Sequence, residues 1–175
     1  MLRDKNLIPL SHQHQRALAL CVRIDRAAPI ADADREAWQA EISQLFQTEI
    51  GIHFTAEERV LFPTAGAFEE LVSLIEELLD DHHVLRSQSE SAQERHMSAS
   101  DLVEFSRRLS AHIRKEERQL FERMQRLMNA EQLDRLGRQL TEALQDASQA
   151  CAVPSSATKL RAARSAGTTG DPTSE

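Results

Sequence analysis

The sequence predicts an all-α protein: an antiparallel up-down four-helix bundle with a short extra C-terminal helix and a disordered tail. Two observations predict this class. Tyr is absent, aromatic residues make up 4% of the chain, and only five Gly and five Pro occur, a composition that favours helices. Four long stretches also carry apolar residues at helical spacing. Because the connections between them are short, an antiparallel bundle is the most economical packing.

The first two helices are predicted over about residues 10–28 and 32–62. Residues 1–9 are expected to form a short extended arm that ends at a Pro. An Ala-Pro-Ile sequence ends the first helix, and either Asp32 or Asp34 can cap the second.

The third and fourth helices are predicted over about residues 68–95 and 98–128. Pro63 and a nearby Gly indicate the turn that precedes the third helix. Ser98 and Asp101 have the spacing of a capping box, which indicates where the fourth helix begins.

A fifth, smaller amphipathic helix is expected over about residues 129–149, where Asn129 and Gln132 provide a cap. From residue 152 onward most residues are Ala, Ser, Thr, Gly or Pro, and no apolar periodicity remains. The sequence therefore predicts one helical domain over residues 1–150 and a disordered tail over residues 151–175.

Charge and composition exclude several classes of partner. The chain has 28 acidic and 21 basic residues, a net charge of −7, and the two signs are interspersed, which argues against nucleic-acid binding. No apolar run approaches the ~20 residues of a membrane span, and the N-terminus lacks the apolar core of a signal peptide. Cys21 and Cys151 lie too far apart in the sequence to suggest a disulfide framework. A cytoplasmic protein is expected.

One motif occurs twice. Residues 53–62 and 112–121 both fit H-x-x-x-E-E-R-x-L-F, and the second copy follows the first by 59 residues. A His and a Glu four residues apart on an α-helix lie on the same face, about one turn apart. Imidazole and carboxylate are ligand types that suit non-haem iron.

The first and third helices each place a further His on the inward apolar stripe. A polar residue on such a stripe needs a partner or a metal. The repeat therefore predicts six candidate metal ligands: His14, His53, Glu57, His82, His112 and Glu116. If each of two six-coordinate metals takes two His, and both Glu and one oxygen bridge them, one position per metal stays open for water or a small substrate.

Neighbouring residues leave alternatives open. His12 competes with His14, and His83 competes with His82. Apolar neighbours three and four residues away favour His14 and His82. The second Glu of each motif copy points about 100° away from the first. An outer-shell or solvated position is therefore expected for Glu58 and Glu117.

These segments resemble the hemerythrin-like, or HHE cation-binding, family of non-haem di-iron four-helix bundles. The matching pieces are PLSHQHQRAL at 9–18, HFTAEERVLFP at 53–63, DDHHVL at 80–85 and HIRKEERQLF at 112–121. The resemblance implies two iron ions in an oxo- or hydroxo-bridged centre at the six residues named above, with manganese as the alternative metal.

The chain differs from oxygen-carrying hemerythrins, which have a fifth His in H-x-x-x-H on the third helix and end with H-x-x-x-x-D. Here Arg86 stands four residues after His82, and the repeat favours Glu116 over Glu117. The chain therefore resembles the four-His, two-Glu branch, which is associated with iron-centre repair under nitric oxide or oxidative stress and with sensing.

We therefore expect a di-iron protein whose open coordination positions react with O₂, peroxide or nitric oxide in a stress-response, sensing or repair role. The alternative is a non-catalytic oxygen or iron binding and storage module. A third hypothesis is a metal-free helical interaction protein. The sequence identifies no protein partner.

Overall fold

The computed structural model describes residues 2–151, with side chains described as far as residue 145. Within this range every regular element is a helix and no strand occurs, which confirms the all-α class. None of the described helices is long and apolar enough to cross a membrane. The predicted disordered tail lies outside the described residues except for Cys151, which is the last residue of a helix.

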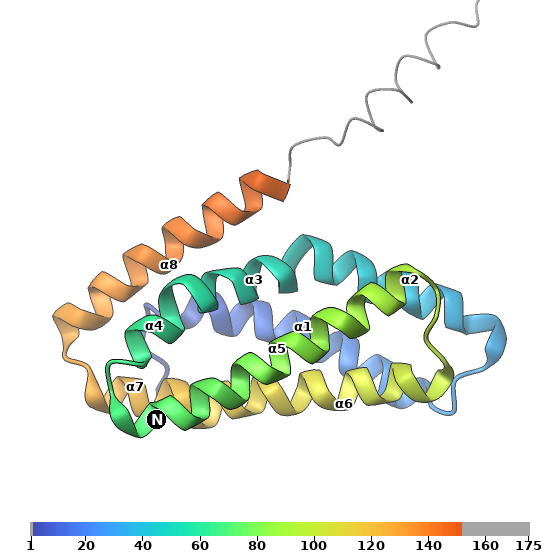
Figure 1. The fold of residues 1–175 in the computed structure, drawn as a ribbon, viewed down its shortest axis with the longest axis horizontal. Coiled ribbons are helices and arrows are strands. Elements are labelled where there is room, and N and C mark those ends of the chain that lie inside the picture. The colour runs from blue at the N-terminus through green and yellow to red at the C-terminus, as the bar shows by residue number, and fades with distance from the viewer. Residues whose placement is uncertain (1, 152–175) are drawn as a thin grey trace, which may run out of the picture.

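Four long helical stretches lie along the long axis of the molecule (Figure 1). Two of them are interrupted by π-helical segments rather than by turns. The α-helices that form the stretches are α1 (Ile8–Ala27); α2 (Arg35–Leu45), α3 (Gly51–Ala56) and α4 (Phe62–Ala65); α5 (Val72–Gln93); and α6 (Ala99–Lys115) with α7 (Phe121–Leu127). The π segments are η2 (Phe46–Ile50), η3 (Glu57–Leu61) and η5 (Glu116–Leu120), and short 3₁₀ turns precede α2 (η1, Asp32–Asp34) and α5 (η4, Glu69–Leu71).

Two helix boundaries differ from the prediction for the same reason. Pro9 lies in the first turn of α1, so the helix begins earlier than expected. Pro63 lies in the first turn of α4, so the second stretch continues to Ala65 instead of ending at residue 62. In both places Pro occupies a position where its missing N–H is tolerated.

The connection between α5 and α6 contains the cap that the sequence predicted and one that it did not. At the end of α5, Arg95 takes a left-handed conformation with φ of 63°, and the His96 N–H donates to the Ser91 carbonyl at 2.9 Å, the pattern of a Schellman cap. Ser98 and Asp101 then form the expected capping box at the start of α6.

Apolar side chains form two clusters, one toward each end of the long axis. The first includes Leu10, Leu61, Leu78 and Leu120. The second includes Ala17, Phe54, Leu85 and Ile113, among others. On each long stretch, the predicted site residues lie between residues of the first cluster and residues of the second. The site therefore lies between two apolar cores.

The fifth helix, α8 (Ala130–Cys151), packs on the outside of α3 and η3. Asn129 and Gln132 form the predicted cap, since each backbone N–H donates to the other's side-chain oxygen at 2.9 Å. The buried face of α8 carries Leu133, Leu136 and Leu140. This helix therefore covers the segment that carries the first motif copy.

An arm of residues 2–7 precedes α1 and contacts α8. Asn6 donates to Asp134 at 3.0 Å and packs directly against Gly137. A Cβ atom at position 137 would clash with Asn6 Oδ1 and lie 2.7 Å from both Cβ and Cγ of Asn6. Gly137 is therefore required for the close approach of the arm to α8.

Replacing Gly137 by Ala should destabilise the protein by about 1–3 kcal/mol, because overpacking outweighs the ~1 kcal/mol that Ala gains over Gly in a helix. Urea denaturation would measure the change. Adding Asn6→Ala removes Oδ1 and Cγ but keeps Cβ, so the double variant should recover part of the stability that Gly137→Ala loses. A single variant as stable as the parent protein would show that the contact is not tight.

Candidate metal centre

The structure brings together all six predicted site residues, although they come from four helical stretches. Their side chains are all buried, with at most 3% of any residue exposed. They form two groups of candidate ligands, and within each group one nitrogen or oxygen from every residue lies within 4.8 Å of the others. The groups are His14, His53, Glu57 and Glu116, and Glu57, His82, His112 and Glu116.

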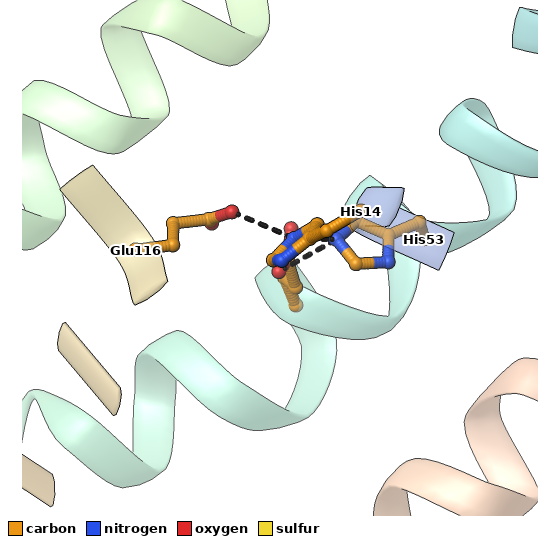
Figure 2. A group of neighbouring side chains, drawn as sticks. His14, His53 and Glu116 are labelled. Atoms are coloured by element: carbon orange, nitrogen blue, oxygen red, sulfur yellow. Dashed lines mark hydrogen bonds and ion pairs between the residues drawn. The ribbon is translucent and has the colours of Figure 1, made fainter. Parts of the chain in front are cut away.

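In the first group the ring nitrogens and carboxylates converge. Nε2 of His14 lies 2.9 Å from Nε2 of His53 and 3.1 Å from Oε2 of Glu116. Nε2 of His53 lies 2.9 Å from Oε1 of Glu57. Figure 2 shows the carboxylate of Glu116 and the ring of His53 pointing toward His14.

The second group uses the same carboxylates. Oε2 of Glu57 lies 3.4 Å from Nε2 of His82, whereas Oε1 of Glu57 faces His53. Oε2 of Glu116 lies 3.4 Å from Nε2 of His112 and is also close to His14. Each carboxylate thus contacts one His of each group, which is the arrangement expected of a carboxylate that bridges two metal ions.

Several of these atoms lack hydrogen-bond partners among the described residues. Both carboxylate oxygens of Glu57 and of Glu116, and Nε2 of His82 and of His112, are buried and make no hydrogen bond. A buried polar atom without a partner costs about 1–3 kcal/mol, and more if it is charged. Imidazole nitrogens and carboxylate oxygens are also the donors that iron accepts. The site therefore fits a pair of metal ions.

Among the protein groups of the cluster, the buried carboxylates dominate the electrostatics. Burial alone would lower the pKa of His14, but Glu116 and Glu117 raise it to about 10. Burial likewise opposes protonation of His82, yet Glu57 and Glu58 raise its pKa to about 9. Metal ions would therefore replace protons as the positive charge that the carboxylates require.

The second Glu of each motif copy accepts a hydrogen bond from a His on another helix. Nδ1 of His14 donates to Glu117 Oε1 at 2.8 Å, and Nδ1 of His82 donates to Glu58 Oε1 at 2.7 Å. Both Glu are partly exposed. A carboxylate on the outer nitrogen fixes the ring so that Nε2 points inward, as is usual for metal-binding His.

The other two His have outer partners that the sequence reading did not identify. Nδ1 of His53 donates to Gln13 Oε1 at 2.8 Å, and Nδ1 of His112 lies 3.8 Å from Asp81 Oδ2. Each partner directly precedes a candidate ligand, Gln13 before His14 and Asp81 before His82. The internal repeat could have indicated Gln13 and Asp81, because each stands one residue before the candidate His of the first or the third helical stretch.

The two competing His lie elsewhere, because His12 and His83 are exposed at the surface. His96 is also exposed, and Cys21 is buried in the second apolar cluster. Of the two Glu in the second motif copy, Glu116 belongs to both groups of candidate ligands and Glu117 to neither.

Both motif copies contain a π-helical segment that begins at the buried Glu. η3 begins at Glu57 and η5 at Glu116, and each runs for five residues. Such segments are frequent at functional sites. Their position within an otherwise helical periodicity was not visible in the sequence.

A small cavity of about 10 Å³ adjoins the site, with room for about one water-sized molecule. His14, His53 and His112 line it together with Gln13, whereas its remaining wall includes Ala17, Phe54 and Leu109. The cavity thus connects three of the four candidate imidazoles to an apolar space.

The fold and the cluster define a helical protein with a candidate site for two metal ions. A family model described as "Hemerythrin HHE cation binding domain" matches residues 9–124 of the 175-residue chain. The chain belongs to this family, which confirms the resemblance seen in the sequence. No curated protein and no solved structure matches the chain. The arm of residues 2–7 and helix α8 lie outside the matched range.

Proposed function

We propose that this chain is an antiparallel four-helix bundle that binds two iron ions and reacts with O₂, peroxide or nitric oxide in stress response, sensing or iron-centre repair. The proposed ligands are His14, His53, Glu57, His82, His112 and Glu116. The observation that carries the proposal is that both buried carboxylates belong to two groups, each of which contains two imidazoles.

The helix directions in the proposed bundle are supported by the connections. Short segments join successive stretches, and the chain reverses at the ends of the molecule (Figure 1). Helix α6 contacts both α1 and α5, and α2 contacts α5. This arrangement lets each stretch contribute one His to the centre.

The ligand set leaves coordination positions open. Arg86, which stands where oxygen carriers have a fifth His, donates to Glu58 at 2.9 Å and is not among the candidate ligands. Two imidazoles and two shared carboxylates leave each six-coordinate ion short of ligands. When bound, iron supplies a change of oxidation state and a position for a small molecule.

The protein's own residues would hold and isolate the ions. Glu117, Glu58 and Gln13 orient the imidazoles through Nδ1. Apolar clusters on both sides exclude bulk water. The adjoining cavity is small and largely apolar, which favours a diatomic molecule or peroxide over a larger substrate.

Metal analysis of protein purified without added metal would test the proposal, with two iron ions per chain as the expected result. Manganese in their place would change the metal but not the site. His82→Ala should lower the metal content or weaken binding, whereas the surface variant His83→Ala should not. Protein without bound metal would instead favour the metal-free interaction hypothesis.

Exposure of the reduced, iron-loaded protein to O₂ would then separate the two metal-binding functions. Irreversible oxidation on a stopped-flow timescale supports redox chemistry. An absorbance change that reverses when O₂ is removed supports the oxygen-binding alternative. The same experiment with nitric oxide in place of O₂ tests the reaction with nitric oxide.

A further inference from the structure

We infer that the two metal positions differ in lability: the ion held by His14 and His53 is released first, and the arm of residues 2–7 controls its release. This inference rests on the proposed two-metal site and goes beyond it. Two independent features of the structure, an outer arginine and the cover over the rings, distinguish the two positions.

The first feature is the origin of the arginine behind each His–Glu pair. Behind His14, Glu117 accepts a hydrogen bond from Arg3 Nη2 at 2.5 Å, and the Arg3 guanidinium lies 4.9 Å from the ring centroid of Phe121. Behind His82, Glu58 accepts from Arg86 Nη2 at 2.9 Å. The same His–Glu–Arg chain is thus built twice, with one arginine from the arm and one from α5.

The two arginines are anchored differently. Arg86 lies one turn after His82 in the middle of α5 and directly follows the fully buried Leu85. Arg3 belongs to a non-helical segment in which only Leu7 is buried.

The arm is held mainly by polar contacts. Gln125 accepts from Arg3 and donates to the Leu2 carbonyl, both at 3.0 Å. The exposed Lys5 lies 3.2 Å from Asp134. A non-helical segment that buries only Leu7 opens at lower free-energy cost than α5, a helix with seven buried side chains. Opening of the arm would remove Arg3 from Glu117 and loosen only His14.

The second feature is the cover over the imidazoles. The ring of His82 stacks on Phe54 with centroids 3.6 Å apart, and the Phe62 ring lies 5.3 Å away. His14 and His53 both line the small cavity, whereas of the second pair only His112 does. Water or a competing ligand therefore reaches the ion held by His14 and His53 more easily than the ion held by His82 and His112. This access also favours earlier release of the ion at His14 and His53.

Release of Fe(II) into excess ferrous chelator under anaerobic conditions would test the inference, starting from protein loaded with two ions per chain. We expect two kinetic phases of about one ion each. Arg3→Met should speed the fast phase by up to about tenfold, because Arg3 acts on His14 only through Glu117, and loss of a partner that itself contacts a ligand costs about 10–100-fold in affinity. The matched variant Arg86→Met should speed only the slow phase.

A second variant tests the arm without altering the contact to Glu117. Lys5→Ala combined with Asn6→Ala removes the side chains that contact Asp134, and it should also speed the fast phase. Circular dichroism would confirm that each variant stays helical.

Release of both ions in a single phase would overturn the inference while leaving the two-metal site intact. The same conclusion would follow if Arg3→Met and Arg86→Met accelerated the same phase, or if the double variant released both ions like the parent protein. Parent protein that binds fewer than two ions would contradict the proposed site itself.

Discussion

Replacing Glu57 or Glu116 by Ala is expected to reduce the bound metal from two ions per chain to one or none. Each carboxylate contacts one His of each group, so its removal takes a ligand from both ions at once. A His contacts only one group, so His14→Ala should weaken one position and leave the other occupied. Metal analysis after gel filtration would measure the stoichiometry.

The matched controls are Glu58→Ala and Glu117→Ala, which should retain two ions. These residues touch the outer nitrogens of His82 and His14 and are absent from both candidate groups. If Glu117→Ala removed metal and Glu116→Ala did not, the fourth stretch would use the spacing of the oxygen carriers, and the carrier function would become the stronger hypothesis.

Removal of metal should lower the melting temperature by roughly 5–10 °C. Ligand at a hundredfold above its dissociation constant stabilises the folded state by ~2.7 kcal/mol, and 1 kcal/mol corresponds to about 2–4 °C for a chain of this size. The unpartnered carboxylates of Glu57 and Glu116 give the physical reason, because they stay buried without metal. Calorimetry of loaded and chelated protein would measure the shift.

Two variants control this experiment. His12→Ala removes an exposed imidazole and should keep the full shift. Glu57→Ala together with Glu116→Ala should abolish it. An unchanged melting temperature after complete chelation of the parent protein would count against binding of metal by the folded state.

Helix positions and caps could be predicted closely because their signals are local. The Ser98–Asp101 and Asn129–Gln132 caps form as expected, since each joins residues three apart in the chain. Errors arose at Pro9 and Pro63, where a residue taken as a helix end occupies the first turn of a helical segment. Asp34 does occupy the N-cap position of α2, but its side chain makes no cap hydrogen bond. Whether Pro ends or begins a helix depends on the neighbouring backbone.

The sequence alone determined which side chains share an inward face. Spacing of four residues aligns His53 with Glu57 and His112 with Glu116 on any α-helix, and the apolar neighbours of His14 place it on the same kind of stripe. The structure then brought these residues together with the others, as the repeat predicted.

The tertiary structure alone decided what stands behind each imidazole. The contacts of Gln13 with His53 and of Glu117 with His14 join residues 40 and 103 positions apart. Helical periodicity gives the face of a residue but not the rotation of one helix against another, and that rotation decides which outer partner a ring nitrogen meets. The contact of Arg3 with Glu117 also required the packing of the arm against α7 and α8. Local spacing therefore identifies the candidate ligands, whereas helix packing determines which side chain contacts the outer nitrogen of each imidazole.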